Sequence, residues 1–318
     1  MDSRVILKIN EPAAEYVERN KDLIKIVNRP PGVKFYTARW DQKKSGTAIF
    51  EHKDNTLSVD NVISITAMNN SSPPEEGLTK FHINSGLTPT DLIDHDQARK
   101  EFILILKNVR KTGWNIFINE GDPRLRGKAM LDFVLSESPV SSMDADYEPT
   151  FAEWMNIPSN RPWHFYANHV YLTISFTREP TLLDPQKPGS YLISYTIESE
   201  NEHYRSYVTP KQKAQWKSAL PSHLEYLPAM RTKKESELRA RGIKIDETYQ
   251  DPPILNLTEQ PRKATSWPAK ISSYVSKTCA NAAARTCRRS SGSRASVLDW
   301  EFASCLLPPS KQLRPSML

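Results

Sequence analysis

A strictly alternating stretch at residues 163–179, WHFYANHVYLTISFTRE, constrains the fold most strongly. Two strand-like runs lie on either side of Asn168 and His169, which predicts an antiparallel hairpin. The apolar residues of the second run stand at every other position: Val170, Leu172, Ile174 and Phe176. Because successive side chains of a strand point to opposite faces, we expect these four to face a core.

Other segments carry weaker versions of the same signals. We expect strands within residues 33–68 and in the stretches 80–86, 114–118 and 190–200. A helix is predicted after Pro89, with Asp94 or Asp96 as its N-cap and Gly113 just beyond its end. TFAE at 150–153 has the spacing of a capping box, and helices follow from Pro210 to Gly242. The pattern is typical of an α+β fold.

The length of 318 residues and an acidic, Pro-containing stretch predict how this fold is divided. We expect an N-terminal α+β lobe over residues 1–135, a linker at 136–149 and a C-terminal α+β lobe over 150–260. Each lobe is expected to be an antiparallel-rich sheet packed with helices.

Residues 261–318 differ from the rest of the chain. They carry ten Lys or Arg and two Asp or Glu, a net of +8, whereas residues 1–260 carry 33 basic and 35 acidic side chains, a net of −2. Without a sustained apolar period, this segment is predicted to be a disordered basic tail. An out-of-frame, non-native ending is one explanation for it, and a basic arm that binds nucleic acid is a rival. The thin spread of its charge argues against the arm.

The residues before 261 contain none of the common catalytic signatures. There is no G-x-S-x-G, no phosphate-binding G-x-x-x-x-G-K-[ST], no G-x-G-x-x-G and no H-E-x-x-H, and the chain has only 10 Gly. The absence of these signatures weighs against the large enzyme classes without excluding a rarer enzyme, and no cofactor is expected.

Metal binding is not expected either. All three cysteines lie in the basic tail at positions 279, 287 and 305, too far apart for a zinc site, and no His follows His223. Asp94, His95 and Asp96 are adjacent, and we interpret them as a helix start.

Four residues are candidates for a binding surface: Arg124, Arg126, His169 and Arg178. The two arginines of DPRLRGK are expected on an exposed loop, where their guanidinium groups would hold a phosphate or an acidic surface of a partner. The alternative is a hydrolase that uses His164 or His169 with a carboxylate, although neither His has an obvious Ser or Cys partner nearby in sequence.

Several long stretches resemble uncharacterised bacterial α+β proteins associated with type VI secretion gene clusters. They include SGLTPTDLIDHDQARKEF, PRLRGKAM, TFAEWM and GIKIDETYQDPP, and the resemblance covers about residues 30–253. It implies an immunity or accessory protein that binds a toxic effector or a secretion component, rather than catalysis. It also implies a periplasmic or lipid-anchored protein that faces the periplasm.

The ends of the chain depart from that family. No signal peptide or lipobox is visible at Met1, and no apolar run approaches the ~20 residues that span a bilayer. We expect the chain to be soluble as given, with a periplasmic location if an upstream anchor is missing. The expected partner is a protein, and nucleic acid is not expected.

Overall fold

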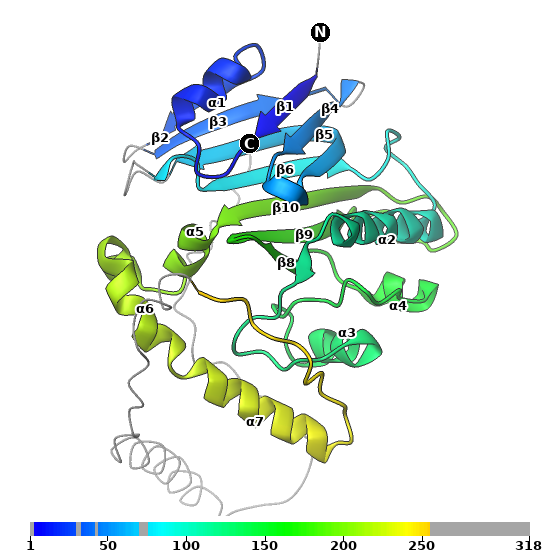
Figure 1. The fold of residues 1–318 in the computed structure, drawn as a ribbon. Coiled ribbons are helices and arrows are strands. Elements are labelled where there is room, and N and C mark those ends of the chain that lie inside the picture. Colours follow the sequence, from blue (N-terminus) through cyan, green and yellow to red (C-terminus); the bar gives the residue numbers. More distant parts are fainter. Residues whose placement is uncertain (1–2, 30–32, 42–43, 70–75, 255–318) are drawn as a thin grey trace, which may run out of the picture. The chain divides into compact units, whose positions relative to one another are not determined.

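The computed structural model describes residues 3–29, 33–41, 44–69 and 76–254. The tail predicted over residues 261–318 and the three cysteines lie outside the described residues. Helices and a large mixed sheet confirm the predicted α+β class (Figure 1).

The sheet contains ten strands. They are β1 (Arg4–Leu7), β2 (Lys25–Arg29), β3 (Val33–Arg39), β4 (Gly46–Phe50), β5 (Leu57–Asn69), β6 (Lys80–Gly86), β7 (Asn115–Ile116), β8 (Trp163–Ala167), β9 (Val170–Arg178) and β10 (Tyr191–Ser199). Along the sheet the order is β1-β4-β5-β6-β10-β9-β8-β7, and β2 pairs with β3, which pairs with β5. Only the β1–β4 pair is parallel among these described strands.

Within the described residues, seven α-helices and two 3-10 helices with full bounds accompany the sheet. They are α1 (Ala13–Arg19), α2 (His95–Lys111), α3 (Gly127–Ser136), α4 (Phe151–Asn156), α5 (Glu200–Arg205), α6 (Trp216–Leu224), α7 (Leu227–Ala240), η2 (Lys53–Asn55) and η4 (Pro210–Gln215). Asp94 caps α2, since its carboxylate accepts from the amides of Asp96 and Gln97. The predicted capping box of α4 between Thr150 and Glu153 is present.

The two faces of the sheet have different roles. On β9, Val170, Leu172, Ile174 and Phe176 are buried at no more than 2% exposure, as their alternation predicts. The ring centres of Phe102, on α2, and Phe176 lie 5.4 Å apart, which places α2 over this face (Figure 1). The opposite face carries partly exposed polar side chains in a row across six strands: Thr37, Thr66, His82, Thr196, Thr173 and His164.

Residues 1–260 form one compact unit, not the two lobes expected from the sequence. The sheet is continuous across the expected division because β6 pairs antiparallel with β10. The stretch expected to be a linker is also partly buried: Met143 is 4% exposed, and its amide donates to the Pro162 carbonyl oxygen at 2.8 Å. Pairing between strands distant in sequence, which local patterns do not encode, joins the two halves.

Candidate partner-binding site

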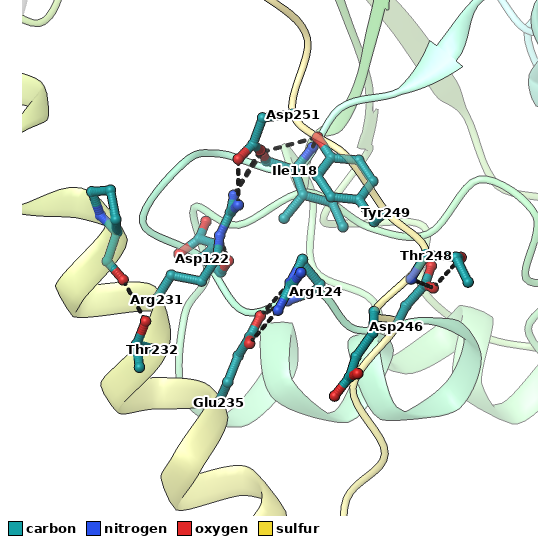
Figure 2. Close-up of polar contacts among 12 residues, drawn as sticks. Ile118, Asp122, Arg124, Arg231, Thr232, Glu235, Asp246, Thr248, Tyr249 and Asp251 are labelled. Atoms are coloured by element: carbon teal, nitrogen blue, oxygen red, sulfur yellow. Dashed lines mark hydrogen bonds and ion pairs between the residues drawn. The ribbon is translucent and has the colours of Figure 1, made fainter. Parts of the chain in front are cut away.

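Arg124, predicted to lie on a binding surface, instead forms an internal ion pair with α7. Its guanidinium donates from Nε and Nη2 to the two carboxylate oxygens of Glu235 at 2.7 and 2.8 Å (Figure 2). The hydrogen bond to Glu235 raises the pKa of Arg124. Burial raises the pKa of Glu235, but the bonds from Arg124 outweigh it and hold that pKa below its usual value. The pair fastens the 119–127 loop to α7.

Arg126 is also occupied by the chain itself. Its guanidinium lies 3.4 Å from carboxylate oxygens of Asp144 and Asp146 and 3.3 Å from one of Asp246. The side chain is 39% exposed, so these long contacts are worth little individually. Together they hold three segments around one positive charge.

Arg178 is buried at 6% exposure and therefore lies within the fold, contrary to the expected surface role. Its guanidinium carbon stands 5.2 to 5.4 Å from the ring centres of Trp154, Phe176 and Tyr191. It donates to the Trp154 carbonyl oxygen at 3.0 Å and to that of Met155 at 3.2 Å. These contacts join α4 to the sheet through cation–π and hydrogen-bonding interactions.

His169 occupies the tip of the β8–β9 hairpin, and its side chain is 40% exposed. Asn168 and His169 have φ of 45° and 65°, as a tight hairpin turn requires. The His169 Nδ1 lies 2.5 Å from a carboxylate oxygen of Glu200, whose side chain is 4% exposed, and 3.3 Å from the Tyr166 hydroxyl. It thus has a carboxylate partner, but neither contact supplies a nucleophile of the serine or cysteine type.

His164 points to the polar face of the sheet, where it has a different environment. Burial, followed by the charge of neighbouring His203, lowers the pKa of His164 to about 4. Its Nε2 is buried without a hydrogen-bond partner among the described residues. An imidazole with this pKa is neutral at pH 7 and is a weak base.

Strand β2 offers a more open surface than any of the predicted residues. In the described part of the chain it pairs only with β3, so the backbone groups along its outer side have no strand neighbour. Ile26 is 51% exposed and Val27 is 38% exposed, on opposite faces of the strand. An edge strand whose outer backbone groups have no strand neighbour is a template for pairing with another chain.

At the other two ends of the sheet, the protein's own side chains bond to backbone groups. On β1, the Ile6 amide donates to the Asn20 side-chain oxygen at 3.0 Å, and the Asn20 side-chain nitrogen donates back to the Ile6 carbonyl at 3.1 Å. At the other end, the amide of Ile118, just beyond β7, donates to the Tyr249 hydroxyl at 2.9 Å. The contrast makes the open edge at β2 a specific feature.

A groove adjoins this edge on the polar face of the sheet. It has a volume of about 480 Å³, compared with about 220 and 180 Å³ for two hollows near Asn61. Its lining combines apolar, hydroxyl and cationic side chains: Leu23, Lys25, Val27, Phe35, Thr37, Arg39 and Thr66. A side chain from an added strand would enter the groove beside Lys25 and Val27.

Sequence reasoning missed this site entirely. The run IKIV at 24–27 has three β-branched residues, and this enrichment is the local indication of a strand here. It is interrupted by Lys25 and is only a few residues long, so its alternation is too short to stand out. Its position at the sheet edge depends on pairing with β3, which is a tertiary property.

The described residues contain neither a metal-ion site nor a membrane-spanning helix that would compete with the β2 edge. Across the described ranges, no group of three or more His, Cys, Asp or Glu side chains is arranged to hold a metal ion. Nor does any helix in those ranges have the length and apolar character needed to cross a membrane. The chain matches no protein-family model, no curated protein and no solved structure, so no relative assigns a role to the β2 edge.

Proposed function

We propose that this protein binds a partner protein by strand addition at β2 and acts without catalysis. The observation that carries the proposal is the exposed β2 edge beside a groove of about 480 Å³. In strand addition, main-chain hydrogen bonds supply affinity and pockets for alternate side chains supply specificity. Both parts are available along β2.

The resemblance to type VI secretion-associated proteins supports a choice of partner class. We propose a toxic effector or a secretion component, bound in the manner of an immunity or accessory protein. The partner would contribute an extended segment, and blocking of that segment would be the mechanism of action. A periplasmic site of action is part of the same proposal.

The test measures co-purification of the full chain with the products of genes encoded beside its own. Ile26→Pro and Val27→Pro are the key variants, because proline removes a backbone N–H. Neighbouring residues of an antiparallel strand direct their amides to opposite sides. One variant therefore loses only an outward donor, while the other loses a bond to β3.

The proline variant that loses only the outward donor should keep the thermal unfolding of the wild type. Its affinity for the partner protein should fall at least tenfold. Leu183→Pro is the matched control, since Leu183 is 45% exposed in the loop between β9 and β10. Binding that survives both β2 prolines in folded protein would falsify the proposal.

A hydrolase is the second candidate, and the contact between His169 and Glu200 favours it. The buried carboxylate orients the imidazole, as the carboxylate of a catalytic triad does. If hydrolysis of any substrate is found, His169→Ala should reduce kcat by 100-fold or more, whereas His223→Ala should leave it unchanged. Equal turnover by both variants removes His169 from consideration.

A further inference from the structure

We infer that the segment bound at β2 is acidic, with a carboxylate opposite Lys25 and apolar side chains opposite Ile26 and Val27. This inference rests on the proposed strand addition and names the chemistry of the strand that is added. It follows from the charge, the register and the alternation of the β2–β3 hairpin.

The hairpin is the basic part of a nearly neutral unit. Residues 25–39 contain four Lys or Arg and no Asp or Glu, a net of +4, whereas residues 1–260 have a net of −2. Lys25 and Arg39 line the groove, and both are exposed. Neither has an ion-pair partner among the described residues, while many other cations in these ranges do.

The register specifies where the charges lie. Lys25 pairs with Thr37 and Val27 with Phe35, so Lys25 and Val27 share the groove face of the hairpin. Arg39 is two residues beyond Thr37 and lines the same groove. A strand added to β2 would place one of its side chains next to Val27 and another next to Lys25. The next side chain on the same face, two residues past the one at Lys25, would lie near Arg39.

Opposite charges directly across a strand pair stabilise it, and like charges destabilise it. In the added strand, acidic side chains therefore suit the two positions near Lys25 and Arg39. β-branched side chains suit the positions opposite Ile26 and Val27. The same rule opposes a second copy of this chain at β2, because antiparallel self-pairing would bring two basic hairpins together. Charge complementarity therefore selects an acidic partner over self-association.

The experiment uses end-capped peptides whose binding to the full chain is followed by fluorescence anisotropy. The acidic probes are Asn-Val-Val-Glu-Thr-Glu and its reverse, Glu-Thr-Glu-Val-Val-Asn, which serve antiparallel and parallel addition. Their neutral counterparts carry Gln in place of Glu. Hydrogen exchange of the amides in residues 25–29 is measured with and without each peptide.

At about 50 mM salt, one acidic probe should bind roughly tenfold more tightly than its neutral counterpart, and about 500 mM salt should remove most of the difference. Lys25→Gln with Arg39→Gln should abolish the preference. The control double variant, Lys211→Gln with Lys244→Gln, removes two exposed cations elsewhere and should retain it.

The outcomes separate the two proposals. Equal binding of acidic and neutral probes, with protection of the β2 amides, overturns the acidic inference and leaves strand addition in place. Preference for the acidic probe without β2 protection overturns the placement at this edge. Concentration-dependent dimers that protect residues 25–29 show that a second copy is the occupant, and overturn both proposals.

Discussion

At the scale of single residues, Glu198 illustrates how partners maintain a charge on the polar face of the sheet. Its carboxylate lies 2.8 Å from Lys80 Nζ and 3.1 Å from His203 Nδ1, with a side chain that is 15% exposed. Burial raises the pKa of Glu198, but the hydrogen bond from His203 and the charge of Lys80 outweigh it and lower the pKa to about 2. The folded state therefore holds this group ionised at acidity where an unfolded chain does not.

The low pKa of Glu198 predicts that the folded state loses stability as the pH falls. An unfolded Glu has a pKa of about 4.3, so the unfolded state takes up the proton first as pH falls. The stabilisation by Glu198, up to about 3 kcal/mol, is present above pH ~4.3 and is lost between there and pH ~2. Urea unfolding at several pH values should show Glu198→Gln approaching wild-type stability in that window. The unfolding free energy of the exposed control Glu225→Gln should differ from that of wild type by the same amount at every pH. A loss of unfolding free energy in Glu198→Gln that does not change with pH would contradict the low pKa of Glu198.

Arg124 and Arg126 are two positions apart and provide a matched pair. Arg124→Met leaves the carboxylate of Glu235, which is 3% exposed, without its main partner and should cost about 2–3 kcal/mol of unfolding free energy. Arg126→Met removes longer contacts at a more exposed side chain and should cost less than about 1 kcal/mol. Denaturant unfolding measures both. If the two variants lose equal stability, Arg124 is not the anchor of this loop.

At the scale of elements, α7 is held to the chain segments around it by a second arginine. Arg231 donates to the carbonyl oxygens of Asn119 and Asp122 at 2.8 Å and pairs with Asp251 at 2.6 Å (Figure 2). The Tyr249 ring lies 6.0 Å from its guanidinium carbon. One side chain therefore joins α7, the loop after β7 and the segment that follows α7.

Loss of this junction should loosen α7 before the sheet. Arg231→Met leaves three polar groups without their donor, so we expect a loss of about 3 kcal/mol and faster proteolytic cleavage within residues 216–254. Limited proteolysis with mass spectrometry locates the cuts. Lys233→Met is the control because that side chain is 79% exposed and its ion pair with Glu237 is long, at 3.9 Å. Cleavage that rises equally in both variants would argue against the junction.

Local signals predict most of these elements, and distance in sequence explains the failures. The α2 cap at Asp94, the capping box at Thr150 and the alternation of β9 depend on residues within a few positions of one another, so they are readable from sequence. Strand β2 was missed because five residues give little periodicity. The predicted binding arginines were misplaced because their partners, such as Glu235, lie over a hundred residues away.

At the scale of the whole described unit, the continuous sheet replaces the expected pair of lobes. Strands β1, β4, β5 and β6 of the N-terminal half continue directly into β10, β9 and β8 of the C-terminal half, and β7 of the N-terminal half pairs with β8. One large hydrophobic cluster includes Val5, Phe102 and Leu238. Separate unfolding of either half would expose the buried face of its neighbour. The sequence indicated the class of the fold, but not this pairing.

Cooperative unfolding follows from that arrangement. Residues 1–260 should melt in one transition, with equal calorimetric and van't Hoff enthalpies, since no division of the sheet leaves two intact cores. Differential scanning calorimetry on the full chain measures this, and circular dichroism supplies a second probe. Two resolved transitions that divide the chain near residues 136–149 would restore the two-lobe interpretation.

The β6–β10 pairing also has a consequence for synthesis. Lys80 and Glu198, which face each other across it, are 118 residues apart in sequence. At ~5–20 residues per second, β6 leaves the ribosome roughly 6–24 s before β10 does. Throughout that interval β6 can pair with β5, but its other edge has no strand neighbour, and the strand carries Phe81 and Ile83, both fully buried in the finished fold. Biogenesis of this protein therefore depends on keeping the open edge of β6 from pairing with other chains until translation supplies β10.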